Sequence, residues 1–173
     1  MSQVHIVAAT TADIPQILEI VNHNILNETC IYDIDERPLE VQLQWFENQM
    51  KNNYPVIVAK FENTVLGYAS YAQYRPKVGY KFSMEHSIYI HPKHQNKGIG
   101  KELLKELIHI ATHNNVHVLI GGIDANNQGS IAFHEKLGFE VVGRMNEVGF
   151  KFDKWLDLIW MQKTLNFKLI DSD

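Results

Sequence analysis

The sequence has little of what secreted, membrane-spanning or nucleic-acid-binding proteins require. It contains a single cysteine, Cys30, so no disulfide can form within the chain and a reducing compartment is expected. No apolar run approaches the roughly 20 residues of a membrane-spanning helix, and the amino end has no signal-peptide pattern. The formal net charge of −4 argues against a general binder of nucleic acid or anionic membranes. We therefore expect a cytoplasmic protein whose partner is a small molecule, with no nucleic acid or membrane bound.

The hydrophobic pattern predicts an α+β domain. No repeat, low-complexity tract or linker interrupts the chain, so residues 1–165 are expected to form a single domain, and residues 166–173 a mobile tail. The expected architecture has three layers, with helices on both faces of a mixed, mostly antiparallel sheet. The expected helices cover residues 12–27, 39–53, 98–114 and 128–137, and the expected strands cover 4–7, 55–61, 65–71, 84–91, 116–123, 139–147 and 156–164.

The most informative stretch is a basic glycine turn within residues 87–101. β-Branched and aromatic residues predict a strand that stops at Pro92, and Gly98 and Gly100 then open an amphipathic helix. Backbone N–H groups at a helix start lack partners and favour anions, while glycine allows the backbone to approach a ligand closely. Positive charge is added by three lysines, Lys93, Lys97 and Lys101. The expected ligand is a phosphate, and in particular a diphosphate.

Two common phosphate-binding motifs do not fit this turn. A Walker loop needs Ser or Thr where Glu102 stands, and a dinucleotide fingerprint needs glycine where Leu103 stands. The pattern Gln95-x-x-Gly98-x-Gly100 instead resembles the [Arg/Gln]-x-x-Gly-x-[Gly/Ala] turn of the GCN5-related N-acetyltransferases, which holds the pyrophosphate of acetyl-coenzyme A. A plain helix-capping glycine turn is the alternative interpretation of the same six positions.

The flanking segments extend this resemblance over about residues 5–165. The run from Asn127 to Leu137-Gly138-Phe139 is similar to the second half of the superfamily signature, in which a strand ends in Asn and a short helix ends in Leu-Gly-Phe. The segments Tyr80-x-x-Ser83-x-Glu85 and Gly149-Phe150-Lys151 resemble one subfamily, the phosphinothricin and methionine-sulfoximine acetyltransferases. The resemblance implies acetyl-coenzyme A as co-substrate and a homodimer as the assembly.

The resemblance also implies the residues that would bind the coenzyme. Backbone N–H groups of the central strand should pair with the pantetheine amides and polarise the acetyl carbonyl, and the glycine turn should hold the pyrophosphate. An Asn and a Ser at the start of the fourth helix should contact the coenzyme arm. The expected set is Ile88, Tyr89, Ile90, Gln95, Asn96, Lys97, Gly98, Ile99, Gly100, Lys101, Asn127 and Ser130.

Two residues are candidates for proton transfer. Glu85 lies among Phe82, Met84 and Ile88, whose apolar side chains would raise a carboxyl pKa towards that of a useful general base. His134 stands where the superfamily commonly has a tyrosine that protonates the leaving thiolate, and imidazole titrates near neutrality. His134 could therefore be the acid or a substrate-orienting partner. The alternatives are a solvent-facing strand Glu and a structural helix His.

The subfamily resemblance predicts a basic pocket for a small anionic amino acid such as phosphinothricin, methionine sulfoximine or methionine sulfone. Arg and Lys suit a carboxylate together with a phosphinate, sulfone or sulfoximine oxygen. Because Lys77 stands where related sequences carry Arg, specificity for phosphinothricin would be weakened. The expected pocket residues are Tyr32, Arg75, Lys77, Tyr80, Lys151 and Trp155. No metal is expected, since the spaced histidines have no acidic or cysteine companion.

Other functions remain open at this stage. A polyamine, aminoglycoside or protein amino terminus could be the acceptor, but a polycation would require an acidic pocket. A non-catalytic sensor of acetyl-coenzyme A would need the glycine turn without a base. Direct transfer in a ternary complex is expected, because Cys30 lies far from the motif in sequence and is expected to be a small buried residue.

Overall fold

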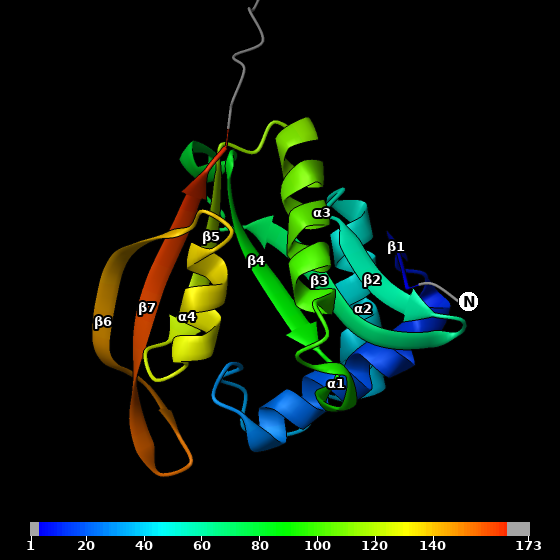
Figure 1. Cartoon of the computed structure of the whole chain (residues 1–173), viewed down its shortest axis with the longest axis horizontal. Helices are drawn as coiled ribbons and strands as arrows, with labels where there is room; N and C mark the ends of the chain where they lie inside the picture. Colours follow the sequence, from blue (N-terminus) through cyan, green and yellow to red (C-terminus); the bar gives the residue numbers. More distant parts are fainter. Residues whose placement is uncertain (1–3, 166–173) are drawn as a thin grey trace, which may run out of the picture.

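A seven-stranded sheet organises the part of the chain that this computed structural model describes, residues 4–165 (Figure 1). The strand order is β1-β2-β3-β4-β5-β7-β6, and neighbouring strands are antiparallel except β4 and β5, which are parallel. The mixed, mostly antiparallel sheet is therefore confirmed. The strands are β1 (His5–Ala8), β2 (Val56–Phe61), β3 (Thr64–Gln73), β4 (Ser83–Ile90), β5 (Val118–Asp124), β6 (Glu140–Lys151) and β7 (Lys154–Thr164).

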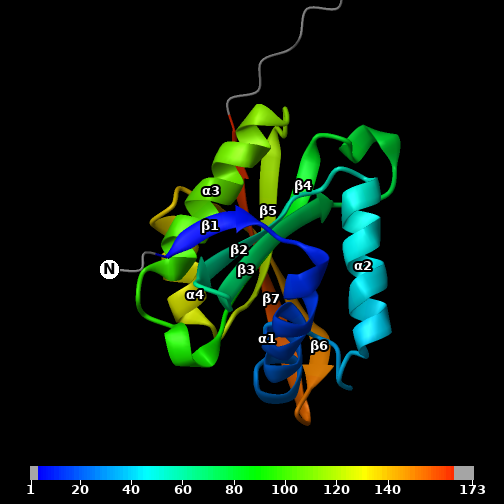
Figure 2. The ribbon, with the colours of Figure 1, turned by 90° about the vertical axis from the view of Figure 1, so that its right-hand side faces the viewer.

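Helices cover both faces of the sheet and complete the three layers (Figure 2). α1 (Ile14–Asn27) and α2 (Leu39–Lys51) lie on one face, and α3 (Ile99–His113) and α4 (Gln128–Glu135) on the other. The alternation of side chains along β2 explains how one strand serves both layers, since Val56 and Val58 pack with α1 while Ile57 and Ala59 pack with α3. Burial of these apolar faces is the main force that fixes the helices to the sheet.

Several element boundaries differ from the sequence prediction by one or more residues, and two of these differences have a clear physical cause. The first helix begins with a 3₁₀ turn, Thr11–Asp13, because the Asp13 carboxylate accepts hydrogen bonds from Thr10 N and Lys60 Nζ. β6 runs to Lys151 rather than ending near residue 147, since register shifts along it absorb the polar residues where the strand was expected to stop. The predicted tail, 166–173, lies outside the described residues. No helix within residues 4–165 is long and apolar enough to cross a membrane.

The separation of β4 and β5 creates the space for a site. The two strands pair over only three positions, Ser83–Glu85 of β4, and then diverge (Figure 1). From His86 onward, β4 therefore presents an open backbone edge toward β5. The first turns of α3 and α4 lie beside this opening. A ligand that enters here meets helix N-termini and unpaired strand backbone together.

Candidate active site

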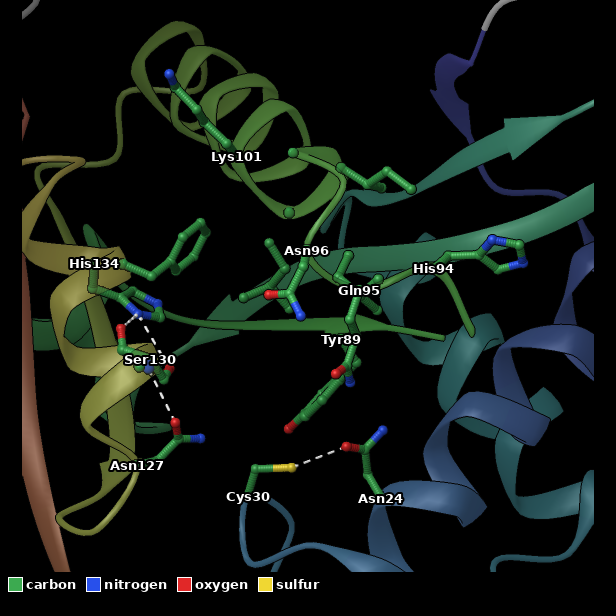
Figure 3. A pocket seen from close by; sticks show the side chains of 17 residues that line it. Asn24, Cys30, Tyr89, His94, Gln95, Asn96, Lys101, Asn127, Ser130 and His134 are labelled. Atoms are coloured by element: carbon green, nitrogen blue, oxygen red, sulfur yellow. Dashed lines mark hydrogen bonds between the residues drawn. The ribbon is translucent and has the colours of Figure 1, made fainter. Parts of the chain in front are cut away.

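The glycine turn forms the cradle that the sequence predicted. α3 begins at Ile99 directly after Gly98, whose φ of +79° lies in the left-handed region. Asn96 also has a positive φ, of +60°, so the chain reverses sharply before the helix. The N–H groups of the first helical turn have no partner within the helix and point into this turn. The Lys101 side chain lies at the same helix start (Figure 3).

A cavity of about 450 Å³ adjoins this cradle. Figure 3 shows Lys101 from α3 on one side, Asn127, Ser130 and His134 from α4 on another, and Cys30 and Asn24 opposite. The structure brings all the predicted coenzyme residues except Lys97 to this cavity, although their binding of coenzyme stays a prediction. Lys97 instead donates to Lys93 O at 3.3 Å. Residues that sequence reasoning missed are Asn24, Cys30, His94, Gly129 and Phe133.

Only some backbone groups of β4 can reach a ligand. His91 N donates to Leu66 O at 2.8 Å, so the alternation of an antiparallel ladder directs the Tyr89 backbone toward β3 as well. The same alternation directs the N–H groups of Ile88 and Ile90 toward the open edge. Of the three N–H groups in the prediction, these two are placed to bind a pantetheine arm, while Tyr89 contributes its side chain to the cavity wall.

α4 begins with a side-chain cap. Asn127 Oδ1 accepts a hydrogen bond from Ser130 N at 3.0 Å, which satisfies one free donor of the first turn. This cap leaves the Asn127 amide nitrogen for a ligand. Asn127 therefore combines the ordinary capping role with a place on the cavity wall, as the sequence allowed.

His134 is buried and fully engaged. Its Nδ1 lies 2.7 Å from Ser130 O, and its Nε2 lies 3.0 Å from Nε2 of His86. Burial lowers the pKa of His134. His86 was missed in the sequence, and Gly121 makes room for it, since a Cβ there would lie 2.8 Å from His86 Cε1. His134 has no free ring nitrogen with which to act as an independent acid.

Glu85 lies in a second cavity of about 190 Å³. Burial raises the pKa of Glu85, and the nearby Arg75 guanidinium partly offsets this rise. A carboxyl group with a raised pKa suits a general base, as the sequence predicted. The cavity is lined by Thr29, Cys30, Tyr32, Glu85, Gly122, Asp124, Leu158 and Trp160.

A smaller cavity of about 60 Å³ joins the other two. It shares Tyr89, Ser130 and His134 with the main cavity. It shares Gly122 and Asp124 with the Glu85 cavity, and Cys30 lines all three. The three cavities therefore adjoin one another in a row from the glycine turn to Glu85.

The predicted basic pocket is not what surrounds Glu85. The lining of its cavity includes two carboxylates, Glu85 and Asp124, and no lysine or arginine among the described residues. Arg75 is outside this lining but near enough for its charge to act on Glu85, and its guanidinium lies 5.1 Å from the Tyr74 ring centroid. Tyr74 in turn packs edge-on against Trp160 of the cavity wall, with ring centroids 5.7 Å apart. The lining around Glu85 is therefore acidic rather than basic, while binding of the acceptor by the predicted basic residues stays a prediction.

The other predicted pocket residues have different positions. Tyr32 lines the cavity, and Tyr80 packs edge-on against Tyr74, with ring centroids 5.8 Å apart. Trp155 is 62% exposed on β7 and stacks with Phe150, and Lys77 lies outside the cavity lining. Lys151 is buried and donates to Glu28 O at 2.8 Å and Ile31 O at 2.6 Å. The Lys151 ammonium therefore holds the loop that carries Tyr32.

Gly149 leaves room for the ring of Tyr32, and this gives a prediction. A Cβ at Gly149 would lie 2.5 Å from Tyr32 Cε2. Gly149→Ala is expected to displace the ring and raise KM for the acceptor several-fold, with the Kd for acetyl-coenzyme A unchanged. Gly143→Ala is the matched control in the same strand, because no atom lies within 4 Å of its added Cβ. An unchanged acceptor KM in Gly149→Ala would remove Tyr32 from the acceptor site.

Cys30 lies nearer the site than its sequence position indicated. Its side chain lines all three cavities, and Sγ donates to Asn24 Oδ1 at 3.2 Å. Cys30 is therefore far from the motif in sequence but close to it in space. Burial nevertheless raises the pKa of Cys30 to about 11, so the group stays a thiol at neutral pH. Because the thiolate is the nucleophilic form, this environment disfavours an acetyl-cysteine intermediate.

The regularly spaced histidines of α3 do not form a metal site with other described residues. His109 and His113 stack on the outer face of α3 with ring centroids 4.2 Å apart. Within residues 4–165, no three or more His, Cys, Asp or Glu side chains are grouped so as to hold a metal ion.

Comparison with known proteins places this geometry in a family. Residues 21–139 match the model of the Acetyltransferase (GNAT) family. The L-methionine sulfoximine/L-methionine sulfone acetyltransferase of Salmonella typhimurium is 40% identical over 158 residues, which cover 91% of this chain and 92% of that protein.

Two solved structures are also similar. One, from Salmonella typhimurium with its cofactor acetyl-CoA, has a TM-score of 0.95 at 38% identity and covers 99% of both chains. A second, the ribosomal-protein-alanine N-acetyltransferase of Brucella melitensis, has a TM-score of 0.92 at 45% identity and covers 93% of this chain and 99% of that one. With its sheet, glycine turn and splayed strands, this chain belongs to the GNAT family of acetyltransferases.

Proposed function

We propose that this protein transfers the acetyl group of acetyl-coenzyme A to the amino group of a small amino acid of the methionine sulfoximine, methionine sulfone or phosphinothricin type. The observation that carries the proposal is the row of three adjoining cavities. It begins at the Gly98 cradle, passes the open edge of β4 and ends at Glu85. A coenzyme with its pyrophosphate at the cradle would direct its thioester along this path toward the base.

The chemistry follows from the order of groups along the path. Glu85 takes a proton from the acceptor ammonium, and the free amine then attacks the thioester carbonyl. The N–H groups of Ile88 and Ile90 are placed to bind the coenzyme and the developing oxyanion. The carbon–sulfur bond then breaks, the nitrogen gives its second proton to solvent to become the amide, and the thiolate needs a proton. Direct transfer in a ternary complex is consistent with the high pKa of Cys30.

The acceptor site has charges that suit an amino acid. Glu85 and Asp124 in the cavity would attract an ammonium group, and Arg75, whose charge acts on Glu85, would bind a carboxylate. A cationic amine without a carboxylate is a second candidate, because the lining itself is acidic. A protein amino terminus is a third, given the similarity to a ribosomal-protein-alanine N-acetyltransferase.

A screen of acceptors tests this proposal. Purified protein with acetyl-coenzyme A would be given methionine sulfoximine, methionine sulfone, phosphinothricin, a polyamine and an alanine-initiated peptide, while thiol release is followed. We expect the highest kcat/KM with methionine sulfoximine or sulfone, and a lower value with phosphinothricin. Arg75→Ala should raise KM for the amino acids more than for a polyamine. Preference for the polyamine or the peptide would overturn the acceptor assignment.

The assembly and location are also proposals. The single cysteine supports a location in the cytoplasm. Exposed apolar side chains on the β6–β7 hairpin support a homodimer. Examples are Val141, Val142, Phe150 and Trp155, which are each at least half exposed. Residues 1–165 are proposed to act as one domain. Sedimentation of the purified protein should give twice the mass of the chain, and Trp155→Glu should shift it toward the monomer.

A further inference from the structure

Two buried histidines meet behind the main cavity. The Nε2 atoms of His86 and His134 lie 3.0 Å apart, and both side chains are buried. Each ring directs its other nitrogen at a backbone carbonyl. His86 Nδ1 lies 2.8 Å from Ile120 O, and His134 Nδ1 lies 2.7 Å from Ser130 O. These three contacts fix both rings.

Counting hydrogens on the two rings shows what the contacts require. A carbonyl oxygen only accepts, so each Nδ1 must carry a hydrogen to make its bond. Two neutral rings would then face each other at 3.0 Å with a lone pair on each Nε2, which is repulsive. A further hydrogen between the Nε2 atoms satisfies all three contacts. The pair then carries three hydrogens on four nitrogens and a charge of +1.

We propose that His86 and His134 hold one proton in common and that this pair protonates the departing thiolate through the Ser130 hydroxyl. The inference rests on the proposed acetyl transfer and assigns the thiolate's acid within it. His86 is a positioning residue, because it reaches the sulfur only through His134. Its role is to allow His134 to carry a hydrogen on both nitrogens.

The hydrogen would pass from His134 to the thiolate along the cavity wall. Ser130 Oγ is 3.4 Å from His134 Nδ1, and both residues line the cavity of about 60 Å³. When the carbon–sulfur bond breaks, its electron pair stays on sulfur. The sulfur takes the Ser130 hydroxyl proton, and the Ser130 oxygen takes the hydrogen from His134 Nδ1. The shared proton remains on His134 Nε2, so the pair becomes neutral, the thiolate becomes a thiol, and solvent later returns one proton.

Burial and hydrogen bonding act on this pair in opposite directions. Burial lowers the pKa of both rings, and it lowers that of His86 to about 3, so it opposes a positive charge on the pair. The three contacts favour the added hydrogen, and a cationic pair in this environment readily gives up the hydrogen on His134 Nδ1. The titratable groups that line the same cavity are Cys30, Tyr89 and Asp124. Burial raises the pKa of Cys30 and Tyr89, so both side chains are neutral near pH 7 and neither places a negative charge beside the pair.

Nuclear magnetic resonance of protein labelled with ¹⁵N-histidine tests the shared proton directly. We expect hydrogens on both Nδ1 atoms and one further downfield, exchange-protected hydrogen coupled to the facing Nε2 atoms. His86→Gln should remove this last signal, whereas the control His109→Gln on exposed α3 should retain it. Only two hydrogens on the pair across the neutral pH range would overturn the proposal. The measurement needs no acceptor, so its failure is distinguishable from failure of the proposed function.

Kinetics provide a second, independent test. His86→Phe keeps an aromatic ring beside Gly121 and Phe139 but has no nitrogen. We expect kcat to fall on the order of 100-fold, with the Kd for acetyl-coenzyme A unchanged and an altered pH–rate profile. His86→Gln can bond to His134 but cannot share a proton, so it should lose a similar factor. A folded variant of either kind with the wild-type kcat and pH profile would overturn the assignment.

Discussion

Glu85→Gln is expected to reduce kcat by about 100- to 10,000-fold while leaving the Kd for acetyl-coenzyme A unchanged. Glutamine has nearly the same shape as glutamate but accepts no proton from the acceptor ammonium. Glu85 lines the second cavity, of about 190 Å³, and does not line the main cavity, so the glycine turn should bind the coenzyme as before. Steady-state rates at saturating acceptor, together with calorimetric titration of acetyl-coenzyme A, measure the two quantities separately.

The pH dependence identifies the carboxylate. Because burial raises the pKa of Glu85, wild-type activity should fall as pH drops through a value above the usual glutamate range, where the base becomes protonated. Glu85→Gln should lack this inflection. Glu40→Gln, an exposed change in the first turn of α2, is the matched control and should behave as wild type. Equal kcat values for Glu85→Gln and wild type would show that Glu85 is not the base.

The shape of the glycine turn was predictable because its information is local in the sequence. A strand, a turn with Gly98 and Gly100, and a helix start follow one another without a break, and each has its own pattern. The structure adds which N–H groups along β4 face the opening. That detail depends on pairing with β3, which a single strand pattern does not contain.

The acceptor half was predicted less well because distant segments build it. Side chains from the loop after α1, from β4, from β5 and from β7 form the cavity around Glu85. The sequence marks Lys151 as a cation but does not show that two loop carbonyls occupy its ammonium. In the same way Cys30 is remote along the chain and close in space. A lysine that the sequence predicts for the pocket, such as Lys151, therefore need not place its charge in the cavity around Glu85.

His86 shows a further limit of prediction from sequence. Glu85 was predicted from its apolar neighbours and a motif, whereas nothing in the strand pattern distinguishes His86 from a structural residue. Its meeting with His134 depends on the space that Gly121 leaves on the neighbouring strand. A glycine in a strand often marks a close approach of this kind, and that was the available signal.

Gly98→Val is expected to weaken acetyl-coenzyme A binding on the order of 100-fold. Gly98 has φ of +79°, where a β-branched residue is strongly disfavoured, so the turn should relax to a negative φ. That change would rotate the N–H groups that open α3 away from the position proposed for the pyrophosphate. Loss of two hydrogen bonds to a charged group, at about 1.5–3 kcal/mol each, accounts for a factor of this size or more.

The control for this variant is a second left-handed glycine. Gly138 has φ of +83° at the end of α4, and the added atoms of Gly138→Val meet the flexible end of Lys163. Both variants should lose thermal stability through backbone strain, but only Gly98→Val should lose coenzyme affinity. Calorimetric titration with acetyl-coenzyme A and with coenzyme A separates the two effects. If Gly98→Val binds both ligands as tightly as wild type, the turn does not hold the pyrophosphate, and the path toward Glu85 begins elsewhere.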